Sequence, residues 1–152
     1  MIELKYGRGT IALDFDESRF RVLSRDENAR PLTDAEIGAR FDDPNGSPGI
    51  DELVHPGQTV LIVVPDATRE VGCGQVINLL VRRLIAGGVN AFDIRTIFAT
   101  GIHRKTTDTE KAAIVTPFIA QRIKMLDHDP RDLMQIKRIG ETSGGIPIEL
   151  NR

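Results

Sequence analysis

The stretch 59-TVLIVVP-65, followed by 74-GQVINLLVRRLIA-86, decides the fold. Within the first part, residues 60–64 are apolar without alternation, which is typical of a strand covered on both faces in a parallel sheet. The second part places its apolar side chains on one helical stripe, and the pair Gly87-Gly88 after it is a common helix stop. The stretch therefore predicts a strand and its crossover helix.

The same pattern recurs downstream. Residues 94–99 predict the next strand, and a capping box at 107–110 opens a helix that Pro117 interrupts. Residues 122–126 predict a third strand. The resulting β-α-β-α-β order over 59–127 is a half Rossmann-like unit, whose right-handed crossovers place the strands side by side and parallel.

Both ends of the chain show strand patterns. Alternation over 2–6 and 11–15 predicts an amino-terminal hairpin, and residues 19–24 are a candidate for a third short strand. Segments 135–139 and 146–150 predict a carboxy-terminal hairpin. We therefore predict an α/β fold: a Rossmann-like three-layer domain with a mostly parallel sheet and a β-hairpin at each end.

Two short helices are expected before the parallel core. The capping box Thr33-Asp34-Ala35-Glu36 predicts a helix running towards Phe41. Ser47-Pro48 fits the N-cap and first residue of one helical turn through Val54, which His55-Pro56-Gly57 ends.

Length and composition limit the possible functions. The chain has 152 residues, which suits a single domain over 1–152. With 20 Lys+Arg against 22 Asp+Glu, six Phe, one Tyr and no Trp, neither nucleic acid nor an anionic membrane is an expected partner.

The single cysteine excludes a disulfide framework and suits the cytoplasm. The longest apolar run, 60–65, is far shorter than the roughly 20 residues of a membrane helix, and no signal-peptide pattern opens the chain.

Polar side chains follow two strands of the predicted sheet, where ligands bind in open α/β folds. Asp66, Thr68 and Arg69 come after the first strand, and His103 and Arg104 after the second. Arg69 suits a substrate carboxylate, and Asp66 suits holding a hydroxyl, a ribose or an imidazole. His103 can take up and return a proton near neutral pH. The set is coherent for acid–base chemistry on a small anion.

A plainer interpretation stays open for the same residues. In it, Asp66 and Thr68 cap the following helix, Arg69 pairs with a surface acid, and His103 is an ordinary loop histidine.

Weaker candidates lie elsewhere. Asp127-His128-Asp129 follows the third strand and is a candidate for metal binding or for orienting a proton carrier, although the composition also suits a turn. We predict no metal site in this chain. Cys73 is expected to be a packing residue, while the helix amides beside it are a candidate anion site.

Several motifs together resemble the amino-terminal domain of the nickel-pincer lactate racemase family. The resemblance runs over essentially the whole chain, and each motif is short but their order and spacing are specific. They are 43-DPNGSP-48, 52-ELV-54, 56-PG-57, 63-VVPDATR-69, 98-FATGIHR-104 with Thr107 and Glu110, 127-DHD-129, 139-IGET-142 and 147-PIELNR-152.

The resemblance implies a 2-hydroxy-acid racemase or epimerase. Such an enzyme moves a hydride transiently from the substrate carbon to a nickel-carrying pyridinium nucleotide, while two histidines act on the substrate hydroxyl. By motif, His103 is one of the two and Arg69 holds the substrate carboxylate. Asp66, with Thr68, is placed against the cofactor or the histidine.

This chain also departs from the family pattern. Glu70 and Lys105 stand where the family usually has proline, which leaves the substrate open. The family's second histidine, its cofactor-linked lysine and its nickel-binding histidine lie beyond Arg152. We therefore expect a fragment that binds no cofactor and is inactive alone, with the missing carboxy-terminal portion as its partner. Two alternatives remain open: a non-catalytic module binding a small anion or nucleotide, and a scaffold with structural loops.

Overall fold

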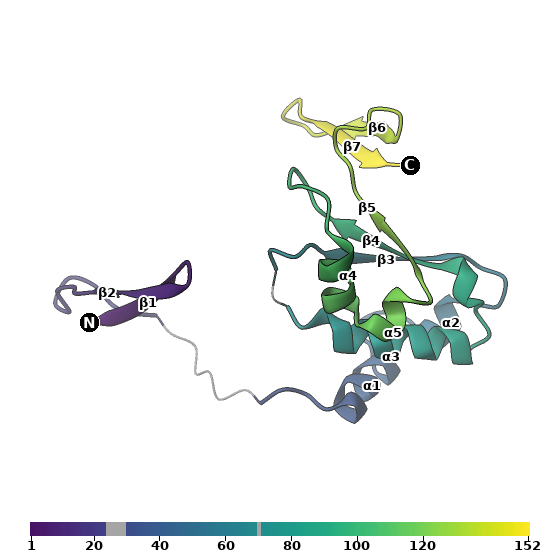
Figure 1. The fold of residues 1–152 in the computed structure, drawn as a ribbon, viewed down its shortest axis with the longest axis horizontal. Helices are drawn as coiled ribbons and strands as arrows, with labels where there is room; N and C mark the ends of the chain where they lie inside the picture. Colours follow the sequence, from purple (N-terminus) through teal and green to yellow (C-terminus); the bar gives the residue numbers. More distant parts are fainter. Residues whose placement is uncertain (24–29, 70) are drawn as a thin grey trace. The chain divides into compact units, whose positions relative to one another are not determined.

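The structure is a computed structural model that describes residues 1–23, 30–69 and 71–152 (Figure 1). Its contacts divide the chain into two units, Met1–Pro31 and Leu32–Arg152. The prediction of a single domain over 1–152 stays a prediction.

The longer unit is built around a parallel sheet. Its strands lie in the order β3-β4-β5, with bounds β3 Val60–Pro65, β4 Ile94–Ala99 and β5 Lys124–Asp127. Helix α3 joins β3 to β4, and α4 with α5 joins β4 to β5; the bounds are α3 Cys73–Ala86, α4 Asp108–Val115 and α5 Pro117–Ala120, with a 3-10 turn, η1, at Ala91–Asp93. The predicted β-α-β-α-β core is confirmed.

The hydrophobic core lies between one face of this sheet and the crossover helices. Val64 and Phe98 are opposite each other in the register of β3 and β4, so their side chains share a face. Both belong to a buried cluster that the crossover helices complete, made of Val64, Ile77, Val81, Leu84, Val89, Ile94, Phe98, Val115, Ile119 and Ile123.

The opposite face of the sheet is open among the described residues. Leu61 is 55 % exposed and Val63 is 66 % exposed. The prediction that residues 60–64 are covered on both faces is therefore wrong for the described part of the chain. Strand order follows chain order, so both right-handed crossovers run in the same direction and place their helices on the same face.

Helices α3 and α4 approach each other very closely at a glycine. A Cβ on Gly74 would lie 2.7 Å from the carbonyl oxygen of Ile114, and Cys73 Sγ lies 3.9 Å from the same oxygen. No other residue type fits at position 74 without a backbone shift. Cys73 is partly buried, which raises the pKa of its thiol, and the residue packs against the core as expected.

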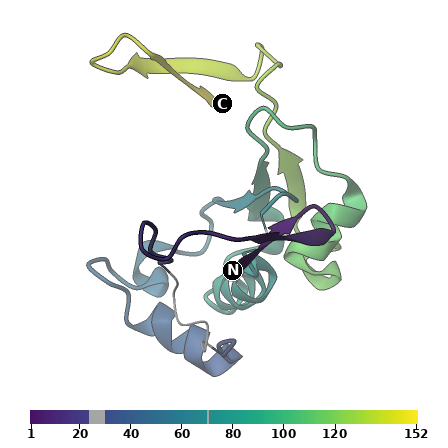
Figure 2. The same cartoon turned by 90° about the vertical axis from the view of Figure 1, so that its left-hand side faces the viewer.

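Two short helices lie before β3. Helix α1, Asp34–Asp42, has the predicted capping box between Thr33 and Glu36. Helix α2, Ile50–Leu53, begins later than predicted, because Gly49 is its N-cap and the Ser47 hydroxyl bonds the carbonyl of Pro48 instead of a helix amide. In Figure 2, α3 is seen nearly end-on with α1 beside it.

Arg83 of α3 fastens both short helices. Its guanidinium lies 2.6 Å from a carboxylate oxygen of Asp42 and 2.6 Å from one of Asp51. The two carboxylates hold the pKa of Arg83 above its ordinary value.

Both predicted hairpins are present. They are antiparallel, with bounds β1 Ile2–Tyr6 and β2 Gly9–Leu13, and β6 Ile136–Glu141 and β7 Pro147–Asn151. The mixed α/β class with a parallel core and two hairpins is confirmed.

The third strand expected over 19–24 is not formed by residues 19–23, and Ser24 lies outside the described residues. The amides of Arg19 and Phe20 both donate to the carbonyl of Asp16, so this segment follows a turn instead of extending. Among the helices of the described residues, none combines the length and apolarity needed to cross a bilayer.

Candidate functional site

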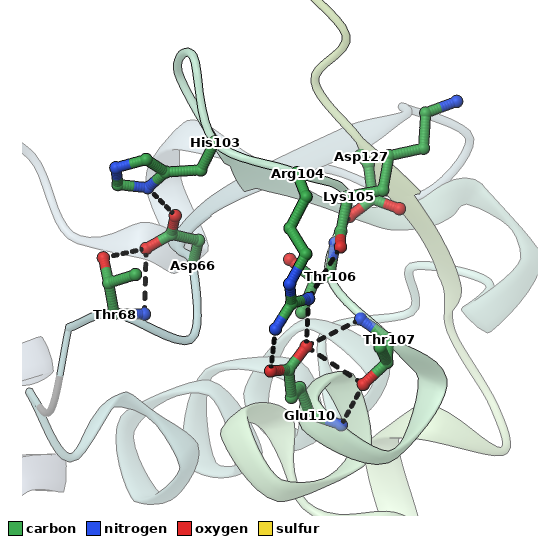
Figure 3. Close-up of polar contacts among 9 residues, drawn as sticks. All are labelled: Asp66, Thr68, His103, Arg104, Lys105, Thr106, Thr107, Glu110 and Asp127. Atoms are coloured by element: carbon green, nitrogen blue, oxygen red, sulfur yellow. Dashed lines mark hydrogen bonds and ion pairs between the residues drawn. The ribbon is translucent and has the colours of Figure 1, made fainter.

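The loops that follow β3 and β4 meet at the carboxyl edge of the sheet. His103 Nδ1 lies 2.6 Å from Asp66 Oδ2 (Figure 3). Asp66 is buried, while the side chain of His103 is 50 % exposed. The structure therefore brings together a shielded carboxylate and an imidazole that solvent or a ligand can reach.

Thr68 holds the Asp66 carboxylate in place. Its hydroxyl donates to Asp66 Oδ1 at 2.6 Å, and its amide donates to the same oxygen at 3.1 Å. The pKa of the Asp66 carboxyl is lowered to about 2, first by the Thr68 hydroxyl and then by the hydrogen bond with His103. Asp66 is thus an anion at neutral pH, so a neutral His103 must carry its proton on Nδ1. Nε2 is then left free to accept a proton.

Acid should weaken the fold through this carboxylate. Because the pKa of Asp66 in the folded chain, about 2, lies below the ordinary aspartate value of 3.8, the unfolded chain binds more protons between these values. The stabilisation is present above pH 4 and is lost as the pH falls towards 2. We expect the free energy of unfolding of an Asp66→Asn variant to fall less steeply over this range than that of the parent chain, measured by urea denaturation.

Other acids, such as Glu110, titrate in the same range, so the difference between the two chains is the quantity that tests the assignment. Identical pH dependence in both would contradict it.

Arg69 lies in a neighbouring cavity. A space of 490 Å³ at the start of α3 is lined by Arg69, whereas Asp66 and His103 line a smaller one of 60 Å³, and Ala67 borders both. Among the described residues, no hydrogen bond or ion pair involves the Arg69 side chain. The expected convergence holds for Asp66, Thr68 and His103; the guanidinium lies beside that group.

One part of the plainer interpretation is wrong. The N-cap of α3 is Gly72, with φ 62° and no side-chain hydrogen bond, so neither Asp66 nor Thr68 caps that helix.

Arg104 points away from His103 and Asp66 (Figure 3). Its guanidinium makes a double hydrogen bond to Glu110, at 2.8 and 2.6 Å, which also closes the capping box of α4 with Thr107. Arg104, followed by Thr107, lowers the pKa of Glu110 to about 2. In this arrangement Arg104 fastens its loop to α4.

His128 is not brought to the Asp66 and His103 pair. Its Nδ1 contacts Asn151 Oδ1, and its carbonyl accepts a hydrogen bond of 2.6 Å from the Thr100 hydroxyl. In the part of the chain that the structure describes, His, Cys, Asp and Glu side chains form no group of three that could hold a metal ion.

Sequence reasoning missed a buried ion pair next to this site. Lys111 Nζ lies 2.6 Å from Asp127 Oδ2, and each side chain is only 10 % exposed. Asp127 Oδ1 accepts a hydrogen bond of 3.2 Å from the amide of Thr106. A lysine within a helix ordinarily faces solvent. Because Lys111 and Asp127 lie on different elements, their pairing leaves no local pattern in the sequence.

Known proteins resemble the chain along nearly its whole length. The family model of the lactate racemase N-terminal domain matches residues 6–152. The lactate racemase of Thermoanaerobacterium thermosaccharolyticum is 24 % identical, and that of Lactiplantibacillus plantarum 26 % identical, each over 99 % of this chain and 36 % of its own length. The chain thus spans about a third of the length of these relatives.

Solved structures show the same fold. The lactate racemase apoprotein from T. thermosaccharolyticum superposes with a TM-score of 0.76 at 24 % identity, over 99 % of this chain and 35 % of that one. A protein from Thermotoga maritima superposes with a TM-score of 0.65 at 23 % identity, over 80 % of this chain and 30 % of that one. With the family model matching almost every residue, this chain belongs to the lactate racemase N-terminal domain family.

Proposed function

We propose that this chain is the catalytic amino-terminal part of a 2-hydroxy-acid racemase or epimerase that uses a nickel-pincer nucleotide. The observation that carries the proposal is the 2.6 Å contact between His103 Nδ1 and Asp66 Oδ2. The pair stands where ligands bind in parallel sheets, in a chain whose relatives are lactate racemases. Because the chain spans 36 % of their length, the activity belongs to a longer protein.

His103 serves as one of the proton carriers in this proposal. Asp66 accepts a hydrogen bond from Nδ1–H, so Nε2 takes the proton of the substrate hydroxyl and later returns it. The Asp66 carboxylate stabilises the imidazolium that forms in between. Thr68 positions the carboxylate for this task.

Arg69 binds the substrate carboxylate. Its planar fork has no partner among the described residues and borders a cavity large enough for a small acid. The cavity that holds Arg69 and the one that holds His103 share Ala67 in their linings, and the proposal requires one substrate to extend from one cavity to the other.

Nickel does not fit the described residues by themselves. They offer no group of three metal-ligating side chains, so the metal ligands in our proposal come from the part of the relatives that has no counterpart in this chain. Hydride transfer is assigned to none of the side chains described here.

The test compares the longer protein with this chain. The longer protein, loaded with cofactor, is expected to interconvert enantiopure lactate, malate or another 2-hydroxy acid, followed by chiral chromatography. This chain, treated in the same way, is expected to show no racemisation and to lose nickel on desalting, measured by mass spectrometry. Racemisation by the chain alone, or none by the loaded longer protein with any hydroxy acid, would overturn the proposal.

A second function is favoured by one observation: Arg69 lines a different cavity from His103. In this alternative, the chain is a non-catalytic module that holds a carboxylate or phosphate at Arg69. Lactate and phosphate titrated into the chain would then shift amide signals around Arg69, and Arg69→Gln would abolish the shifts. Binding of this kind, together with full dispensability of His103 in the longer protein, would favour the module.

A further inference from the structure

The buried pair Lys111 and Asp127 has no part in the proton transfer proposed above. Lys111 lies on α4, and Asp127 is the last residue of β5. The lysine Nζ also lies 5.8 Å from the centroid of the Phe98 ring in the core. Burying two charges costs desolvation that their attraction barely offsets, so stability alone explains the pair poorly.

The second oxygen of Asp127 holds the loop that carries His103. Asp127 Oδ1 accepts from the amide of Thr106, a residue that is itself buried. At the other end of the loop, the Thr100 hydroxyl donates to the carbonyl of His128, at 2.6 Å. Asp127 and His128, which are consecutive in the chain, thus anchor the two ends of the 100–106 loop.

The position of the His103 ring depends on the backbone of this loop. Its amide donates to the carbonyl of Thr100 at 2.9 Å, and its ring reaches Asp66 on the other loop. A hydrogen bond of this kind weakens steeply once the atoms separate by more than a few tenths of an ångström. A small displacement of the anchors would therefore release the ring from Asp66.

We propose that Lys111 and Asp127 are positioning residues for His103. The ammonium of Lys111 keeps the Asp127 carboxylate aimed at the Thr106 amide, and this contact fixes the loop so that His103 Nδ1 stays on Asp66. The proposal rests on the proposed function for the use made of His103, but the positioning can be measured without turnover.

The readout is the tautomer of His103 in this chain. At a pH where free imidazole is neutral, roughly 8 to 9, correlation spectra of nitrogen-15-labelled histidine report which ring nitrogen carries the proton. In the parent chain we expect the Nδ1–H form. In Lys111→Met/Asp127→Leu, which removes the charges and the acceptor, we expect most of the population to change to the Nε2–H form.

Three further variants separate positioning from simple loss of stability. Lys111→Met/Asp127→Asn removes the charges but keeps an acceptor for Thr106, so its loss of the Nδ1–H form is expected to be smaller. Lys111→Arg keeps the ion pair and is expected to keep the parent tautomer. Arg83→Met breaks the ion pairs that the last turn of α3 makes with Asp42 and Asp51. This variant is expected to lower stability without changing the tautomer of His103.

The outcomes for positioning and for function are distinguishable. If the folded Lys111→Met/Asp127→Leu variant keeps the Nδ1–H form, the positioning role is wrong, whatever the activity of the longer protein. If the tautomer changes and the longer protein racemises nothing, positioning stands and the proposed function fails. If both hold, kcat in the longer variant should fall by up to about 100-fold with little change in KM.

Discussion

Replacing His103 with glutamine in the longer protein is expected to lower kcat by roughly 100- to 10,000-fold, the usual contribution of a general acid–base group. Glutamine can still donate a hydrogen bond to Asp66, so the loop keeps its main contact. It cannot accept and return a proton near neutral pH. The rate of conversion of an enantiopure hydroxy acid, followed by chiral chromatography, measures the effect.

A matched substitution elsewhere provides the control. His55 is exposed in the turn before β3, and its side chain has no place in the site described here. His55→Gln is expected to leave kcat within about threefold of the parent. Equal turnover in the parent and in His103→Gln would show that His103 carries no proton, and would favour the scaffold or binding-module interpretation.

Replacing Lys111 with methionine is expected to lower the free energy of unfolding of this chain by about 3 to 5 kcal/mol, because it leaves a buried carboxylate without its partner. Methionine matches the stem of lysine, so packing beside Phe98 is largely kept. Urea denaturation followed by circular dichroism measures the change.

The double variant Lys111→Met/Asp127→Asn tests the cause. It removes both charges and keeps an acceptor for the Thr106 amide, so most of the lost stability is expected to return. Lys105→Met serves as the exposed control: it removes a surface cation that lies 3.0 Å from Asp129, and only a small change is expected. Equal losses in the single and double variants would mean that packing, and not the unpaired charge, sets the cost.

The parallel core was predictable because its signals are local. The apolar run at 60–64 and the helical stripe of α3 reflect burial and period, which the sequence shows directly. The open face of the sheet was not predictable in this way. An unbroken apolar run indicates that both faces tend to be covered, but Leu61 and Val63 are exposed among the described residues because both crossover helices lie on the other side.

The candidate site was predictable in part. The carboxyl ends of neighbouring parallel strands meet at one edge, which is enough to place His103 close to Asp66. The position of Arg69 depends on the loop's own turns, so the rule could not decide which cavity its fork enters. Lys111 and Asp127 lie on different elements, and nothing short of the tertiary fold reveals their pairing.

The contact at Gly74 joins the two helices, α3 and α4, that follow the loops of Arg69 and His103. Helix α3 begins just after the loop of Arg69, and α4 begins just after the loop of His103. Gly74 lies near the start of α3 and Ile114 near the end of α4, so the start of α3 cannot shift towards α4 without displacing the last turn of that helix. A side chain at position 74 would therefore push the two helices apart and change the spacing of the Arg69 and His103 loops that precede them, from outside the candidate site.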